Sequence, residues 1–149
     1  MLESAGRVSA CGYLVDTHGL GVKNALGPRP MKQHRLPEFV RRYFVAFDGA
    51  PLAAPLELAP HLVLGAVDYA RELGFEPQPD FEAARGQLGS WCGPSAISFG
   101  RDGRPMFVSG IADDVAGILG TLEASVGRGG FDFIAAVGDE HELPARRAA

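Results

Sequence analysis

Cysteine is scarce in this chain, which has only Cys11 and Cys92 among 149 residues. Two distant thiols exclude a small scaffold held together by several disulfides, and we interpret them as a reduced pair in a cytoplasmic protein. Long apolar runs are also missing, because the stretch at residues 62–67 is far too short to span a bilayer. The first residues lack the basic and then apolar pattern of a signal peptide. We therefore expect a cytoplasmic chain without a membrane partner.

Glycine and proline are abundant, with 20 and 11 residues respectively, and they favour many turns over a bundle of long helices. Hydrophobic residues make up 46% of the chain and charged residues 21%, which is typical of a folded globular protein. The length favours one domain over 1–149 with its own core. We expect residues 1–6 and 138–149 to be mobile termini.

Apolar periodicity and turn residues predict eight regular elements joined by a few loops. The turn at Asp102–Gly103 is typical of a β-hairpin, and Asp113 is a plausible helix cap. The predicted elements are a strand at 8–15, a loop at 17–35, helices at 36–47, 59–73 and 80–88, a hairpin of strands 96–99 and 105–108, a helix at 113–126 and a strand at 131–137.

This order, β-α-α-α-β-β-α-β, predicts an α+β fold. We expect a single compact domain with one mixed or antiparallel sheet of about four strands. Helices should pack mainly on one face of that sheet, since each element must bury its apolar side.

Positive charge is concentrated between Lys23 and Arg42. This segment contains six Lys and Arg residues and one acid, Glu38, so it carries +5 while the rest of the chain carries −9. A basic segment on an acidic protein can attract an anionic ligand or an acidic partner. Such charges can equally be solvated surface groups.

The turn that follows the first predicted strand contains Asp16, His18, Gly19, Gly21 and Lys23. The spacing of its two glycines does not match a phosphate-binding P-loop, which needs four residues between the glycines and a lysine directly after the second. A looser anion nest remains open, with the glycine amides facing the anion and Lys23 as counter-charge.

Asp16 and His18 could act as an acid–base pair or as two metal ligands. A metal site needs further ligands, and His34, His61 and His141 stand in no recognised ligand spacing. We therefore predict neither a metal site nor a cofactor.

The segment Trp91–Ser95 reads W-C-G-P-S, which resembles the W-C-G-P-C turn of thioredoxin-like proteins. In that family a strand leads into the turn and a helix leads out, whereas here a helix leads in and a predicted strand leads out. Ser95 also replaces the second thiol, so we interpret the resemblance as coincidence. Cys92 as a lone nucleophile with a histidine base stays open beside a simple packing role.

Two functional hypotheses follow. The first is a binding or interaction domain that uses the 16–42 loop and basic helix to contact an unknown protein or an anionic small molecule, with Gly19, Gly21, Lys23, Arg35, Arg41 and Arg42 as binding residues. The second is a small hydrolase or transferase for a phosphate-bearing substrate, with Asp16 and His18 as acid–base groups and Lys23 and Arg35 as anion holders. Nucleic acid is not favoured, since the chain is acidic and shows no recognisable nucleic-acid module.

Overall fold

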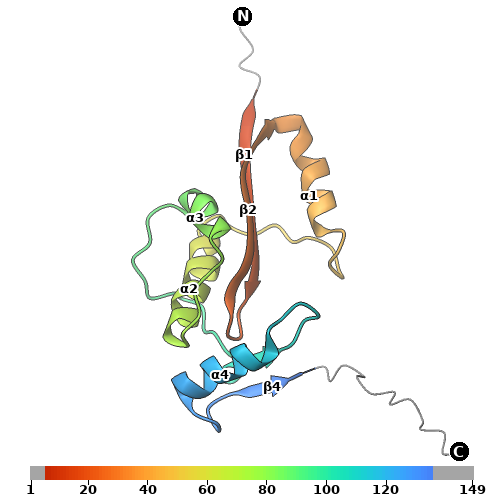
Figure 1. Cartoon of the computed structure of the whole chain (residues 1–149). Helices are drawn as coiled ribbons and strands as arrows, with labels where there is room; N and C mark the ends of the chain where they lie inside the picture. Colours follow the sequence, from red (N-terminus) through yellow and green to blue (C-terminus); the bar gives the residue numbers. More distant parts are fainter. Residues whose placement is uncertain (1–5, 136–149) are drawn as a thin grey trace, which may run out of the picture.

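The computed structural model describes residues 6–135 and shows an α+β fold, as predicted (Figure 1). The predicted mobile termini lie outside the described residues, except for Gly6. The carbonyl oxygen of Gly6 accepts a hydrogen bond from the Gln33 amide at 2.8 Å.

A long antiparallel hairpin forms the axis of the molecule (Figure 1). Strand β1 (Arg7–Asp16) pairs with β2 (Gly21–Lys32), from Asp16 opposite Gly21 at the turn to Arg7 opposite Lys32 at the open end. The predicted loop at 17–35 is therefore wrong over most of its length.

Glycine and proline did not prevent strand β2, because they occupy positions where the ladder tolerates them. Gly27, at φ +102°, and Pro28 lie where the register shifts, and Pro30 lacks an amide hydrogen on a strand with only one neighbour.

Helices cover both faces of the hairpin, so the prediction that they pack mainly on one face is wrong (Figure 1). Helix α2 (Leu58–Glu72) and the short α3 (Asp80–Arg85) lie on one face, and α1 (Leu36–Phe44) lies on the other (Figure 1). Neighbouring residues of β1 point to opposite faces of the hairpin, as side chains of a strand do. The Tyr13 hydroxyl donates to the Ala84 carbonyl of α3 at 2.6 Å, whereas a Cβ added at Gly12 would lie 2.6 Å from the Tyr43 ring of α1.

The main core lies between the hairpin and helices α2 and α3. It contains Val22, Ala25, Val63, Leu64, Val67, Phe81, Ala84 and Leu88. By contrast, every residue of α1 is at least partly exposed. The short 3₁₀ turn η1 (Gln33–Arg35) joins β2 to α1, and η2 (Gly86–Leu88) follows α3.

A second, smaller core joins the end of α2 to the last elements of the described chain. Strand β3 (Met106–Val108) pairs in parallel with β4 (Asp132–Ile134), and α4 (Val115–Val126) packs against them. Its buried side chains are Leu73, Phe107, Leu122 and Phe131. The strands among residues 6–135 thus form two sheets of two strands each, and the predicted single sheet of about four strands is wrong.

The predicted strand at 96–99 is absent from the described chain because its backbone is bonded to α2 instead. The Ala96 amide donates to His61 Nδ1 at 3.0 Å, and the Ser95 hydroxyl donates to the His61 carbonyl at 2.7 Å. The predicted turn around Asp102–Gly103 does form, with Arg101 and Arg104 as a bridge.

Two element ends differ from the prediction. Helix α1 ends at Phe44 instead of Phe47. The N-cap of α4 is Asp114, whose carboxylate accepts from the Gly117 amide at 3.1 Å, and not the predicted Asp113. The remaining predicted helices lie within a few residues of the observed ones.

Gly21 brings the hairpin against α2, and its substitution tests that contact. The residue has φ +69°, and an added Cβ would lie 2.7 Å from Ala70 Cβ and 2.9 Å from the Ala66 carbonyl oxygen. We expect Gly21→Ala to lower the free energy of unfolding by about 2–4 kcal/mol, since backbone strain and overpacking add. Chemical denaturation measures the loss.

Gly49→Ala is the matched control. Gly49 also has positive φ, at +94°, but a Cβ there would meet nothing within 4 Å. It should cost only the strain, about 1 kcal/mol. Equal losses in the two variants would contradict the close approach of the hairpin to α2.

Candidate functional site

The hairpin divides the eight predicted site residues into two groups. Five of them, Asp16, His18, Gly19, Gly21 and Lys23, lie at or near the turn, while Arg35, Arg41 and Arg42 follow the open end. The ten residues of β1 place Arg35 about 30 Å from the turn. Helix α1 then runs back along the hairpin, where its Tyr43 ring lies against Gly12, so Arg41 and Arg42 are nearer to the turn than Arg35 is. A single ligand-sized site containing all eight is therefore not formed.

Asp16 stabilises the turn through its carboxylate. One oxygen accepts a hydrogen bond from the His18 amide at 2.8 Å, and the other accepts from the Leu20 amide at 3.1 Å. The contact described between Asp16 and His18 thus involves the backbone of His18 and not its imidazole. His18 is exposed, and its carbonyl oxygen accepts from the Met106 amide at 2.9 Å, which joins the turn to β3.

The other predicted residues near the turn are also engaged within the fold. Gly19 and Gly21 are buried, the latter against α2. Lys23 Nζ lies 3.2 Å from the Asp113 carboxylate, and the same carboxylate oxygen accepts from the Gly110 amide at 2.7 Å. The Gly110 amide and the Lys23 ammonium hold the pKa of Asp113 below its usual range. The turn end of the hairpin is therefore held against α2 and against the segment that contains Gly110 and Asp113.

The open end of the hairpin, unlike the turn, is hollowed and lined by basic side chains. A hollow of about 490 Å³ opens there between β2, η1 and α1. We call it the basic hollow, and it is lined by Arg29, Pro30, Met31, Lys32, His34, Arg35, Glu38, Phe39 and Arg42. Of these residues, only Arg35 and Arg42 were predicted from the sequence as binding residues. Arg29 and Lys32 belong to the local excess of positive charge, but they and His34 were not predicted as binding residues.

The basic hollow keeps a positive charge after its internal ion pairs are counted. Glu38 is its single acid, and its carboxylate accepts from Arg41 and from Arg42, each at 2.7 Å. These hydrogen bonds lower the pKa of Glu38 to about 2, so it stays ionised. In the described part of the chain, Lys32 and Arg35 form no ion pair.

Arg29 is positioned by an aromatic ring. Its guanidinium carbon lies 5.9 Å from the centroid of the Phe39 ring, a cation–π arrangement. The phenyl ring of an α1 residue thus orients a cation of β2 at the wall of the hollow. Planar guanidinium groups suit bidentate binding of carboxylate or phosphate.

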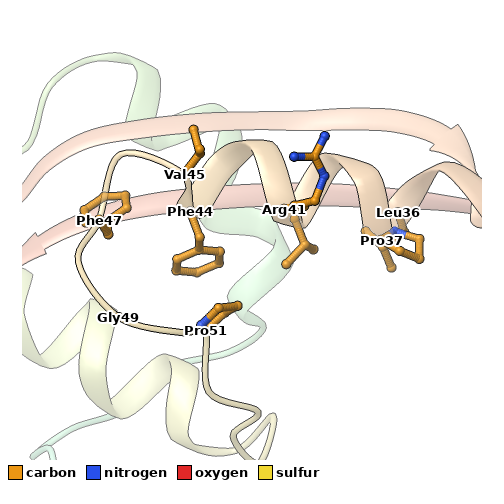
Figure 2. Close-up of a pocket in the computed structure, with 9 residues that line it drawn as sticks. Leu36, Pro37, Arg41, Phe44, Val45, Phe47, Gly49 and Pro51 are labelled. Carbon is orange, nitrogen blue, oxygen red and sulfur yellow. The ribbon is translucent and has the colours of Figure 1, made fainter.

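Arg41 belongs to a second hollow, on the other flank of α1. This α1 groove has a volume of about 640 Å³ and lies between the helix and the loop that follows it (Figure 2). Its lining is apolar apart from Arg41: Leu36, Pro37, Val40, Phe44, Val45, Phe47, Gly49 and Pro51. Phe44, at one wall of this groove, is 38% exposed.

The segment around Cys92 has no thioredoxin-like context. Residues 89–99 contain no helix or strand in the described structure, and Trp91 Nε1 donates to the Asp68 carboxylate at 2.7 Å. Both cysteines are free thiols, with Cys92 exposed and Cys11 partly buried.

Within residues 6–135, no group of three or more His, Cys, Asp or Glu side chains could hold a metal ion. No helix in that range has the length and apolar character needed to cross a membrane. Comparison of the chain with protein-family models, curated proteins and solved structures gives no match.

The role of Asp16 in the turn can be tested by its stability effect. Asp16→Ala removes both acceptors of the turn amides, and we expect a loss of about 1–2 kcal/mol in the free energy of unfolding. Asp16→Asn, which keeps one carbonyl oxygen, should lose less. Asp48→Ala, at an exposed position after α1, is the control. A fully stable Asp16→Ala protein would contradict the structural role.

Asp113 makes stability depend on pH in acid. Its pKa is lower in the folded chain than in the unfolded chain, where an aspartate titrates near about 3.9. The unfolded chain therefore binds the proton first as the pH falls, so the stabilisation is complete at neutral pH and disappears in acid. We expect the stability difference between wild type and Asp113→Asn to shrink from pH 7 to pH 3 in urea titrations. A difference independent of pH would exclude this linkage.

Proposed function

We propose that this chain is a binding domain whose basic hollow holds an anionic group of a protein or small-molecule partner. The observation that carries the proposal is the convergence of Arg29, Lys32, Arg35 and Arg42 on one hollow that contains a single acid. Glu38 offsets one of these charges, so the hollow keeps a net charge of +3 with His34 neutral. The proposal places the chain in the cytoplasm, where its two free cysteines would stay reduced.

The arrangement favours binding because several cations act on the same volume. One exposed ion pair contributes only about 0–1 kcal/mol. Four cations from β2, η1 and α1 attract a multivalent anion together, and their guanidinium groups can bind its oxygens in pairs. The exposure of the hollow means that added salt should weaken the attraction.

The geometry adds no support to the hydrolase or transferase alternative. That hypothesis needs Asp16 and His18 beside Arg35, but the hairpin separates them by about 30 Å. The Asp16 carboxylate also accepts two turn amides, and Lys23 is paired with Asp113. The proposed binding site instead uses Lys32 and Arg35, which form no ion pair within the described residues.

Inorganic pyrophosphate is a suitable probe of the basic hollow, and calorimetry measures its affinity. We expect Lys32→Ser/Arg35→Ser to weaken binding about tenfold or more, because two of the four cations are removed without breaking a described ion pair.

The control for that experiment is Arg71→Ser/Arg128→Ser. It changes the net charge equally but lies far along the chain, where each arginine pairs with a glutamate. Equal weakening in both double variants, or none in either, would contradict the assignment of the basic hollow as the anion site.

A further inference from the structure

The α1 groove is lined by exposed apolar side chains, because Phe44, Val45 and Phe47 are 38%, 76% and 47% exposed. Twelve large hydrophobic side chains of the described residues are exposed, and six of them lie between Phe44 and Leu58. The most exposed of the six are Val45 at 76%, Leu52 at 91% and Leu56 at 81%. Exposed apolar side chains that line one groove, as Phe44, Val45 and Phe47 do, are typical of a contact site.

The α1 groove and the basic hollow lie on opposite flanks of the same helix. Successive helix residues are about 100° apart, which places Pro37 and Phe44 on the groove side and Arg42 and Phe39 on the other side. Glu38 and its two arginine partners form the exposed ridge between them. The ridge is about 10 Å wide, the diameter of a helix.

A small anion therefore occupies only the basic hollow. A polypeptide crosses about 10 Å with three or four extended residues or two helical turns, and so reaches both hollows. The two hollows together thus favour a chain-like occupant.

The positive charge around α1 indicates which kind of polypeptide would bind there. Arg41 lies at the edge of the α1 groove with a 67% exposed side chain, and Arg35 and Arg42 lie across the ridge. The nearest acid, Glu38, is already paired with two arginines. An occupant with acidic side chains next to apolar ones is complementary to this surface.

An anionic membrane surface fits the arrangement less well. The outermost ridge of α1 carries the charged Glu38, while the apolar side chains of Leu36 and Val40 also line a hollow against β1. A helix that lies in a bilayer turns its apolar face outward, to the lipid. Here much of that face is directed at the hairpin.

We propose that the partner is an acidic, amphipathic polypeptide segment that crosses α1. Its carboxylates enter the basic hollow, and its apolar side chains fill the α1 groove. This inference rests on the proposed function, because it assigns the same basic hollow to the carboxylates of the partner. It adds the α1 groove as the site that distinguishes a peptide from a simple anion.

The test uses two synthetic peptides of twelve residues with equal numbers of glutamates, one with Leu and Phe between them and one with Ser in their place. Fluorescence anisotropy should show at least tenfold tighter binding of the peptide with Leu and Phe. Val45→Ser/Phe47→Ser should remove most of that preference. The matched control, Ile111→Ser/Phe133→Ser, replaces two exposed apolar side chains near β3 and β4 and should keep the preference.

Pyrophosphate binding separates the two proposals. Val45→Ser/Phe47→Ser should still bind pyrophosphate like the wild type, which also shows that α1 remains in place. If pyrophosphate binds the basic hollow but both peptides bind equally, the peptide inference is overturned and the proposed function stands. If pyrophosphate and the peptides all fail to bind, both are overturned.

Two other occupants of the α1 groove would give different results. If the wild type sediments with phosphatidylserine vesicles, Val45→Ser/Phe47→Ser does not, and the peptides do not bind, the groove is a membrane site and the inference is overturned. A concentration-dependent dimer that the same variant abolishes, again without peptide binding, would assign it to a second copy and would also overturn it.

Discussion

The close approach of Gly21 to helix α2 sets the position of the hairpin, and the hairpin positions everything else. With no side chain at Gly21, the start of β2 lies against Ala66 and Ala70, and Val22 and Ala25 enter the main core. The turn then reaches the segment before β3, where the carbonyls of Thr17 and His18 accept amides of Gly100 and Met106. The open end extends beyond the core and carries α1 (Figure 1). One steric constraint therefore separates a buried end of the hairpin from an exposed one.

The sequence predicted elements whose evidence is local and missed those that depend on distant partners. Helix α2 could be predicted from its apolar spacing, and strand β1 from its apolar run. Strand β2 was missed because Gly27, Pro28 and Pro30 oppose a strand in isolation, whereas pairing with β1 accommodates them. The strand predicted at 96–99 is wrong because His61, more than thirty residues away, accepts a hydrogen bond from the Ala96 amide. Such long-range hydrogen bonds leave no periodic pattern in the chain.

The candidate site shows the same division. The excess of positive charge in residues 23–42 is a local property, and this segment contains the residues that line the basic hollow. The hairpin determines which of these charges lie together. Lys23 lies near the turn and pairs with Asp113, whereas Arg29 and Lys32 lie near the open end beside Arg35. Asp16 attracted attention as a polar residue at a strand end, and its carboxylate stabilises the turn. From the sequence alone, a carboxylate that stabilises a turn cannot be distinguished from one that takes part in catalysis or binding.

We propose that ligand binding belongs to the open end of the hairpin and structural linkage to its turn. Backbone amide chemical shifts, followed by NMR during titration with pyrophosphate, test this claim most directly. We expect saturable changes of chemical shift concentrated in residues 29–42, which contribute to the basic hollow and α1. Shifts concentrated in residues 16–23, at the turn, would contradict it.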